Sequence, residues 1–388
     1  MNATAVVLKK NKDKPIRNRH HWIFSGAVKT LPAFEDGDIL PVKSVDGDFL
    51  GYGYFNKKSA IIGRMLNFDA RPPREAIAAH LESAIALRKK FIESGTNACR
   101  LVNGEGDGLP GLIVDRYADV FVIQVGTLGI EKLKPLILEQ LILKTSPRSV
   151  YEKSNLVTRR EEGLADFEGL LYGDPVETVE INEDGLRYLV EIPGSQKTGF
   201  FLDLREMRRL VRSLAQDRRV LNCFSYTGAF SVAALAGGAS AADSVDTSGR
   251  AIALADKNCA LNGFSTGCRF YVADVFEFLR RQEFSSDFVI LDPPAFAKKK
   301  ADVVSACRGY KDINRLAMLK IQPGGLLLTF SCSYFVGESL FQQVVFQAAA
   351  ETSRRVRILQ RHRLAFDHPV NIFHPESEYL RSLLLYVE

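Results

Sequence analysis

Two short motifs contain residue types that could perform chemistry on a planar substrate. Residues 292–296 have the sequence DPPAF and follow the apolar run 288–291, while residues 329–333 have the sequence TFSCS and overlap the apolar run 326–330. Continuous apolar runs of this length, separated by a helix-sized segment, are typical of neighbouring strands in a buried parallel sheet. Reactive groups collect at the carboxyl ends of such strands. The pattern therefore predicts that the acid and the thiol of these motifs share one sheet edge.

The chemistry of the two motifs suits a nitrogen base. Asp292 offers a carboxylate, the prolines fix the loop carbonyls, and Phe296 offers a ring for stacking. A thiolate at Cys332 can attack an electron-poor ring carbon. C5 of a pyrimidine becomes nucleophilic enough for methyl transfer only after a group has added at C6, and a cysteine is suited to that addition. The alternative is that Asp292 caps a helix and Cys332 is a small buried apolar residue.

A cofactor site is expected where strand 220–224 turns into a helix. Only Gly228 is present there, so the G-x-G-x-x-G fingerprint of dinucleotide sites is absent and NAD or FAD is disfavoured. Asp246, at the end of the next strand, can accept hydrogen bonds from ribose hydroxyls, and Asp274, after the third strand, from an adenine amino group. An adenosyl ligand without a pyrophosphate indicates S-adenosylmethionine. Each acid alone could instead cap a helix.

The elements that must position these residues alternate regularly. Strands are expected at 220–224, 242–246, 269–272, 288–291, 326–330, 356–359 and 381–387. Helices are expected between most of them, near 228–235, 249–261, 275–281, 310–320 and 338–350. This alternation predicts an α/β fold with a doubly wound, mostly parallel sheet of seven strands. The last strand follows no crossover helix, which allows it to lie antiparallel.

Length and local composition predict three domains within the 388 residues. Residues 1–70 combine short apolar segments with turn residues, which predicts a small β-barrel or sandwich. Residues 71–175 begin with a proline-containing linker and contain an expected helix at 76–94 and a hairpin turn at 103–111, which predicts a small α+β domain. Residues 176–388 form the third domain, which contains the predicted parallel sheet.

Composition limits the functional classes. The chain contains 46% hydrophobic and 25% charged residues and has a net charge of +5, which permits but does not require a nucleic-acid partner. Its six cysteines contain no CxxC pair, so we expect reduced thiols, a cytoplasmic protein and no metal site. We also expect neither a signal peptide nor a membrane span.

Basic and aromatic side chains near the predicted site and near the N-terminus are candidates for RNA contacts. Such residues pair with phosphates or stack on bases, and flipping a base out of structured RNA requires a stacking partner. The candidates are Arg17, Trp22, Phe296, Lys298, Arg308, Tyr310 and Lys311. The alternatives are a solvated basic tail beside a core tryptophan and a solvated lysine run.

The chain resembles the RlmI family of bacterial 23S rRNA 5-methylcytosine methyltransferases over essentially its whole length. The motifs that carry the resemblance are the segments 196–203 (QKTGFFLD), 221–228 (LNCFSYTG), 244–248 (SVDTS), 291–294 (LDPP), 306–314 (ACRGYKDIN), 329–333 (TFSCS) and 367–370 (DHPV). The resemblance implies an N-terminal PUA domain, a middle α+β domain and a C-terminal class I methyltransferase domain. It also implies a substrate in 23S rRNA or an assembling large ribosomal subunit, and members of the family often form homodimers.

The family's site residues transfer to matching positions of this chain. The resemblance implies that Cys332 attacks C6 of the target cytosine and that Asp292 hydrogen-bonds near N3 and the amino group. Cofactor contacts are implied at Lys197, Thr198, Asp203, Phe224, Tyr226, Gly228, Asp246, Ser248, Asp274 and Asp292.

One departure and two alternatives remain at this point. Broader RNA 5-methylcytosine enzymes have a second cysteine directly after the proline of the acid loop, whereas this chain has Pro294 there. Removal of the C5 proton must then rely on Cys307 or a water. A loop of the type DPP-aromatic is also used by methyltransferases that modify the exocyclic amine of adenine or guanine. A PUA-bearing RNA-binding protein without turnover is the third possibility.

Overall fold

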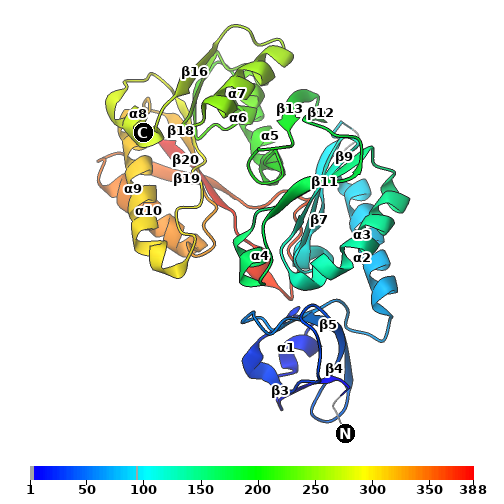
Figure 1. Cartoon of the computed structure of the whole chain (residues 1–388). Coiled ribbons are helices and arrows are strands. Elements are labelled where there is room, and N and C mark those ends of the chain that lie inside the picture. Colours follow the sequence, from blue (N-terminus) through cyan, green and yellow to red (C-terminus); the bar gives the residue numbers. More distant parts are fainter. Residues whose placement is uncertain (1–3, 93–94) are drawn as a thin grey trace. The chain divides into compact units, whose positions relative to one another are not determined.

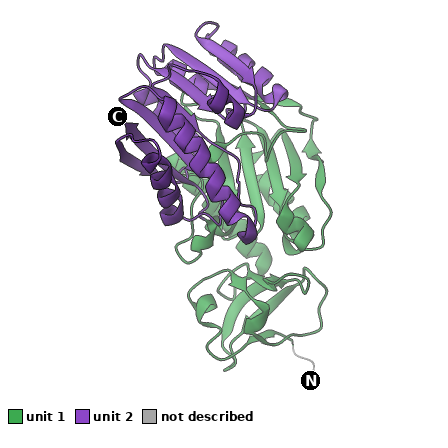
Figure 2. Ribbon diagram, turned by 90° about the vertical axis from the view of Figure 1, so that its left-hand side faces the viewer, with its two compact units in different colours: residues 1–184, 190–203, 366–377 green, residues 185–189, 204–365, 378–388 purple. Residues whose placement is uncertain are grey.

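The structure of the protein is a computed structural model that describes residues 4–92 and 95–388. The chain forms two compact units, which Figure 2 distinguishes by colour. Unit 1 contains residues 1–184, 190–203 and 366–377, and unit 2 contains residues 185–189, 204–365 and 378–388. Residues 176–184, 190–203 and 366–377, which we expected within the domain 176–388, thus belong to unit 1. The division into domains at residues 70 and 175 stays a prediction.

Unit 1 begins with a six-stranded sheet, ordered β2-β6-β5-β4-β1-β3. Its strands are β1 (Val6–Leu8), β2 (Trp22–Ile23), β3 (Val28–Thr30), β4 (Ile39–Lys43), β5 (Phe49–Phe55) and β6 (Gly63–Met65), accompanied by the short helices α1 (Lys14–Arg17) and η1 (Ser25–Ala27). Alternate residues of these strands, such as Val6, Leu8 and Val42, form a separate apolar core. Gly53 permits close pairing of β5 with β6, because a Cβ there would lie 2.8 Å from the Arg64 carbonyl oxygen.

The middle part of unit 1 is an α+β layer, as predicted. Its five-stranded sheet has the order β11-β10-β9-β8-β7, and α2 and α3 pack over it around a shared apolar core (Figure 1). The elements are α2 (Pro73–Phe91), β7 (Ala98–Asn103), η2 (Gly104–Asp107), β8 (Leu112–Tyr117), β9 (Val120–Val125), α3 (Leu128–Thr145), β10 (Ser149–Ser154), α4 (Val157–Glu161) and β11 (Phe167–Gly173). The predicted end of the first helix, Ser94, lies outside the described residues.

Two predicted turns are confirmed. Strands β7 and β8 pair antiparallel across the glycine-rich segment 103–111, which is therefore a hairpin connection. Strands β12 (Thr178–Glu183) and β13 (Leu186–Glu191) form a two-stranded sheet on either side of Asp184 and Gly185. Both turn residues have positive φ angles, which suits a tight hairpin.

Unit 2 contains the predicted seven-stranded sheet, ordered β16-β15-β14-β17-β18-β20-β19. The strands are β14 (Arg219–Cys223), β15 (Ala241–Asp246), β16 (Cys268–Val272), β17 (Phe288–Leu291), β18 (Gly325–Ser331), β19 (Val356–His362) and β20 (Arg381–Val387). The first five run parallel, and β20 runs antiparallel to both β18 and β19. All residues of β17 and β18 are buried, which explains why their sequences are mainly apolar.

Helices cover both faces of this sheet. On one face α8 (Val275–Arg281), α9 (Val303–Lys320) and α10 (Glu338–Ala350) share a core with the strands. On the other face α5 (Arg205–Leu214), α6 (Ala229–Ala236) and α7 (Gly249–Leu261) pack in series (Figure 1). The strand order reverses between β14 and β17, and ligands of doubly wound sheets bind outside the carboxyl ends of the strands at such a reversal. Within the described ranges, no helix is both long and apolar enough to cross a bilayer.

Candidate active site

The carboxyl ends of the central strands of unit 2 bring the predicted acids to one edge. In the strand register, Cys223 of β14 is opposite both Val245 of β15 and Leu291 of β17. The residues that follow the last two, Asp246 and Asp292, therefore reach the same edge of the sheet. This edge lies at the reversal of the strand order, where a doubly wound sheet binds its ligand.

Cys332 contacts the loop that begins at Asp292. Its Sγ donates a hydrogen bond to the carbonyl oxygen of Pro293 over 3.4 Å. The backbone N–H of Asp292 donates to the carbonyl oxygen of Cys223, also over 3.4 Å, which joins the start of the loop to the end of β14. Both Asp292 and Cys332 are half-buried. The structure thus brings together the two motifs that the sequence analysis singled out.

Ser333 and Tyr310 fix the far side of this loop. Ser333 Oγ accepts a hydrogen bond from the backbone N–H of Ala297 at 3.0 Å and lies 2.8 Å from the hydroxyl of Tyr310. Burial raises the pKa of Tyr310, and the nearby Cys332 acts in the same direction, so the phenol stays protonated. Ser333 belongs to the predicted motif 329–333, but no role was predicted for it.

Two aromatic residues predicted to stack on a base have different environments. Tyr310 is 0% exposed, and its ring packs against Phe296 and Phe341 with centroid distances of 4.7 and 5.6 Å. Stacking by Tyr310 does not fit this burial, because no ring face is open; Tyr310 supports the loop instead. Phe296 is half-buried and remains the stacking candidate. Gly309 leaves room for it, since a Cβ there would lie 3.2 Å from the Phe296 ring.

The turn after β14 has an unusual backbone. Phe224, Tyr226 and Gly228 have φ angles of 59°, 46° and 75°. Positive φ is uncommon for aromatic residues and concentrates at functional sites. The hydroxyls of Ser225 and Thr227, between them, are buried and have no hydrogen-bond partner among the described residues. These two hydroxyls were not predicted as site residues, although they alternate with the predicted cofactor residues Phe224, Tyr226 and Gly228.

Hydrogen bonds to the Asp246 carboxylate join this turn to the end of β15. One of its oxygens accepts the backbone N–H of Tyr226 and the other accepts that of Ser248, each at 2.9 Å. A carboxylate oxygen has two lone pairs, so each oxygen can accept a further hydrogen bond from a ligand. The turn after β14 and the end of β15 are therefore hydrogen-bonded to each other, and the Asp246 oxygens can still accept hydrogen bonds from a ligand.

Asp274 has the capping role that the sequence left open for the acids, and Ser248 caps a helix as well. The Ser248 side chain accepts the N–H of Ala251 at the start of α7, at 3.2 Å. The Asp274 side chain accepts the N–H of Glu277 at the start of α8, at 3.0 Å. Their predicted cofactor contacts stay predictions.

The segment 196–203 belongs to unit 1, where a buried network holds it. Thr198 Oγ1 donates to Asp115 at 2.6 Å and lies 2.8 Å from the hydroxyl of Tyr117, which in turn accepts the N–H of Phe200 at 3.1 Å. Arg100 forms a two-pronged ion pair with the same Asp115, at 2.8 and 2.9 Å. Thr198 therefore orients its own segment.

The other predicted cofactor residues of this segment lie near one another. Lys197 Nζ is 3.7 Å from a carboxylate oxygen of Asp203 and 4.4 Å from the centroid of the Phe201 ring. The predicted cofactor contacts of Lys197 and Asp203 stay predictions.

Some of the basic residues predicted to contact RNA are already in ion pairs within the protein, and others are exposed to solvent. Lys298 and Arg308 are exposed, whereas Lys311 pairs with Glu351 at 2.8 Å. Near the N-terminus, Arg17 forms ion pairs with Asp13 and Asp48. The structure therefore favours Lys298 and Arg308 as phosphate ligands over the two paired cations.

Trp22 is only partly exposed. Its Nε1 donates to Glu105 at 2.9 Å, and its ring meets that of His374 edge-on with a centroid distance of 4.5 Å. Trp22 is thus part of a polar cluster within unit 1, and its predicted contact with RNA stays a prediction.

Comparison with known proteins agrees with this geometry. Residues 130–362 match the S-adenosylmethionine-dependent methyltransferase family, and residues 6–68 match a PUA-like domain. A protein of Shewanella denitrificans named Ribosomal RNA large subunit methyltransferase I is 39% identical over 98% of this chain and 99% of its own length. A protein of the same name from Alteromonas mediterranea is 41% identical over 98% of each chain.

A solved structure extends the likeness to the whole fold. The crystal structure of SMU.776 complexed with SAH matches this chain with a TM-score of 0.86 at 26% identity. The match covers 99% of this chain and 100% of that one. SAH is the product that S-adenosylmethionine becomes when it has lost its methyl group.

Proposed function

The chain belongs to the ribosomal RNA large subunit methyltransferase I family of S-adenosylmethionine-dependent methyltransferases, and from this premise we propose that it methylates C5 of a cytosine in 23S rRNA. The observation that carries the C5 assignment is the hydrogen bond between the Cys332 thiol and the Pro293 carbonyl. It supports a nucleophile beside the loop that would hold the base. The PUA-like domain supports an RNA substrate, either free or in an assembling large subunit.

The residues around the turn after β14 fit S-adenosylmethionine. Asp246 keeps acceptor capacity for ribose hydroxyls, since each oxygen accepts only one backbone N–H. The unpartnered hydroxyls of Ser225 and Thr227 can bond a polar ligand at the same turn. A pyrophosphate would require several close backbone amides, and Gly228 is the only glycine of the turn. S-adenosylmethionine supplies an electrophilic methyl group on its sulfonium.

The protein's residues then make C5 reactive and hold the base. Cys332, as the thiolate, forms a bond to C6, and the electron pair of the C5–C6 double bond becomes available at C5. Asp292 accepts a hydrogen bond from the amino group beside N3, and the half-buried ring of Phe296 stacks on the base. After C5 has been methylated, loss of its proton restores the double bond and expels the thiolate of Cys332.

A water is the better candidate than Cys307 for removing the C5 proton. Burial raises the pKa of Cys307, so its thiol is protonated and a poor base near neutral pH. The chain also lacks a cysteine directly after Pro293. We therefore assign proton removal to solvent at the edge of the loop.

Transfer to the exocyclic amine of adenine or guanine is the second candidate. The observation in its favour is the Pro293 carbonyl, which already accepts a hydrogen bond and could accept one from an amino group instead. In that reaction Cys332 has only a packing role. The two functions therefore differ in the product nucleoside and in the need for the thiol.

Methyl transfer to large-subunit rRNA freed of its proteins tests the proposal. Wild type, Cys332→Ala and Cys307→Ala are incubated with methyl-labelled S-adenosylmethionine, and the RNA is digested to nucleosides. We expect labelled 5-methylcytidine from wild type and Cys307→Ala, and a rate lower by about 10³-fold or more for Cys332→Ala. A labelled N-methyl nucleoside, produced equally by Cys332→Ala, would establish the second candidate instead.

A further inference from the structure

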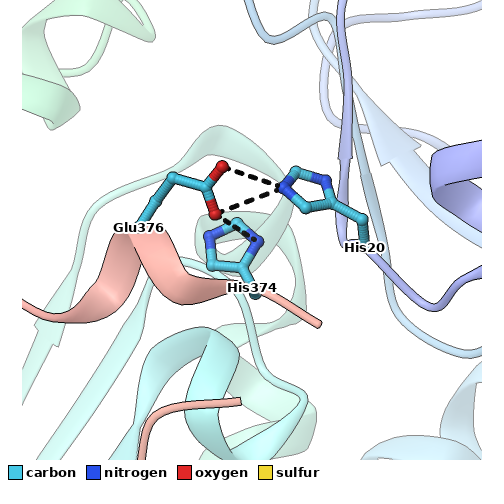
Figure 3. A group of neighbouring side chains, drawn as sticks. All are labelled: His20, His374 and Glu376. Atoms are coloured by element: carbon cyan, nitrogen blue, oxygen red, sulfur yellow. Dashed lines mark hydrogen bonds and ion pairs between the residues drawn. The ribbon is translucent and has the colours of Figure 1, made fainter. Parts of the chain in front are cut away.

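Three side chains from opposite ends of the chain converge within unit 1 (Figure 3). His20 precedes β2, while His374 and Glu376 lie at the short helix η5 (Pro375–Ser377). One nitrogen or oxygen atom from each side chain lies within 4.8 Å of the others. His20 Nε2 is 3.3 Å from Oε1 of Glu376, and His374 Nδ1 is 3.9 Å from Oε2.

His374 has an unsatisfied polar atom inside this cluster. The residue is 1% exposed, and its Nδ1 is buried with no hydrogen-bond partner in the described part of the chain. Its distance of 3.9 Å from Glu376 is too long for a hydrogen bond. Leaving such an atom unpaired destabilises the folded state, and most buried polar groups in proteins do have a partner.

Neighbouring groups hold the cluster in place. The rings of His20 and His374 lie 4.5 Å apart, and Trp22 packs edge-on against His374 at the same centroid distance. Trp22 is itself oriented by the hydrogen bond from its Nε1 to Glu105, at 2.9 Å. Packing against each other and against Trp22 therefore restrains the two imidazoles.

We propose that His20, His374 and Glu376 bind a divalent transition-metal ion. Two imidazoles and one carboxylate form a ligand set that suits Zn²⁺ and its neighbours, whose bonds to these atoms are about 2.0–2.2 Å long. Tetrahedral coordination with such bonds separates the ligand atoms by about 3.3 Å. One carboxylate oxygen of Glu376, Oε2, lies 3.4 Å from His20 Nε2 and 3.9 Å from His374 Nδ1, and the three ligand atoms all lie within 4.8 Å of one another, so side-chain shifts complete the site. A water can take the fourth position.

The ion would cross-link two segments of unit 1 that lie far apart in the sequence. It would join residue 20, just before β2, to the segment 366–377 of the same unit, whose Asp367 carbonyl also accepts a hydrogen bond from Arg88. The inference goes beyond the proposed methyl transfer and does not depend on it. It also revises the expectation of no metal site. His20 and Glu376 are 356 positions apart, so no local spacing could reveal the site.

The chain contains a built-in reporter for this site. Trp22 is the single tryptophan of the sequence and lies against His374. The full-length protein is stripped with a chelator and titrated with Co²⁺, which quenches tryptophan fluorescence at short range, and Zn²⁺ is then added as a competitor. We expect saturable quenching at one equivalent that Zn²⁺ reverses. Absence of saturable quenching in the wild type would overturn the proposal.

Variants separate this site from adventitious binding. Glu376→Gln, which keeps the shape of the side chain, and His20→Ala should each raise the Co²⁺ midpoint at least tenfold. His362→Gln is the matched control, because His362 contacts Gln360 in unit 2 and should leave the midpoint unchanged. Equal midpoints in all four proteins would assign the metal to other groups and overturn the proposal.

Thermal unfolding of the wild type gives a readout that needs no variant. A ligand that binds only the folded state raises its stability, so Zn²⁺ should raise the Tm of the stripped protein. A Tm that Zn²⁺ leaves unchanged contradicts the site.

Discussion

His21 shows how single buried residues set the properties of unit 1. Burial lowers its pKa to about 4, even though the hydrogen bond between its Nδ1 and the Met65 carbonyl favours the charged form. The ring is therefore neutral in the folded protein near neutral pH. An unfolded chain would take up a proton on this histidine at an ordinary pKa of about 6.5.

This difference predicts a loss of stability in mild acid. Between pH 6.5 and pH 4 the unfolded state binds a proton on His21 that the folded state does not bind, so the free energy of unfolding falls as the pH falls. For His21 alone the loss is about 2 kcal/mol at pH 5. Urea unfolding followed by Trp22 fluorescence at pH 7.5 and pH 5 measures the loss. His21→Gln should show a difference smaller by about that amount; an unchanged difference would refute the assignment to His21.

Which site residues could be predicted depended on what surrounds them in the sequence. Asp292 and Cys332 each follow a continuous apolar run, so the strand ends, and hence their meeting at one edge, followed from the sequence. The burial of Tyr310 did not follow, because the side of α9 that packs on the sheet is set by tertiary contacts. Thr198 bonds Asp115, which lies 83 positions away, so its positioning role was also inaccessible.

At the scale of elements, the turn between β14 and α6 requires its glycine. Gly228 has a φ of 75°, and a Cβ there would lie 2.7 Å from the Cβ of Ala255 on α7. The glycine therefore allows α6 and α7 to approach while the backbone turns over the expected cofactor site.

Gly228→Ala should weaken both stability and cofactor binding. The left-handed backbone and the clash with Ala255 together predict a loss of about 1–3 kcal/mol and a shift of the turn that holds Ser225 and Thr227. Chemical denaturation and calorimetric titration with SAH measure the two effects. Gly263→Ala is the control, because it has a similar φ of 82° but no atom within 4 Å. If both variants bind SAH like the wild type, the turn does not hold the cofactor.

Most elements of unit 2 were predictable because strands and helices alternate with distinct periodicities. The seven strands and the antiparallel β20 are confirmed. Strand β11 at the edge of the middle sheet was missed, since its residues are mostly exposed and give no buried alternation. The short helix α4 was missed too, because its five residues are too few to show a helical period.

At the scale of the whole molecule, the proposed function requires that RNA reach the edge of the sheet in unit 2. Exposed Lys298 follows the Asp292 loop directly, whereas Lys311 is engaged by Glu351. Phosphate contacts release counterions, so each one makes RNA binding more sensitive to salt.

Lys298→Ala should therefore reduce the salt dependence of RNA binding. Loss of one phosphate contact lowers the slope of log K against log salt by about 0.7–0.9. Filter binding of an rRNA fragment over a range of salt concentrations measures the slope. Lys311→Ala, which removes a cation paired within the protein, should keep the wild-type slope. A slope equally unaffected in both variants would exclude Lys298 from the RNA interface.

Trapping the covalent intermediate tests the central claim most directly. An rRNA fragment that contains 5-fluorocytidine has no proton to lose at C5, so the bond between Cys332 and C6 cannot break after methylation. With S-adenosylmethionine present, we predict a denaturant-resistant complex of wild type and Cys307→Ala with this RNA, mapped to Cys332 by peptide mass spectrometry, and no complex with Cys332→Ala. An adduct on another cysteine, or methylation of rRNA by the wild type without any adduct, would contradict the proposed mechanism.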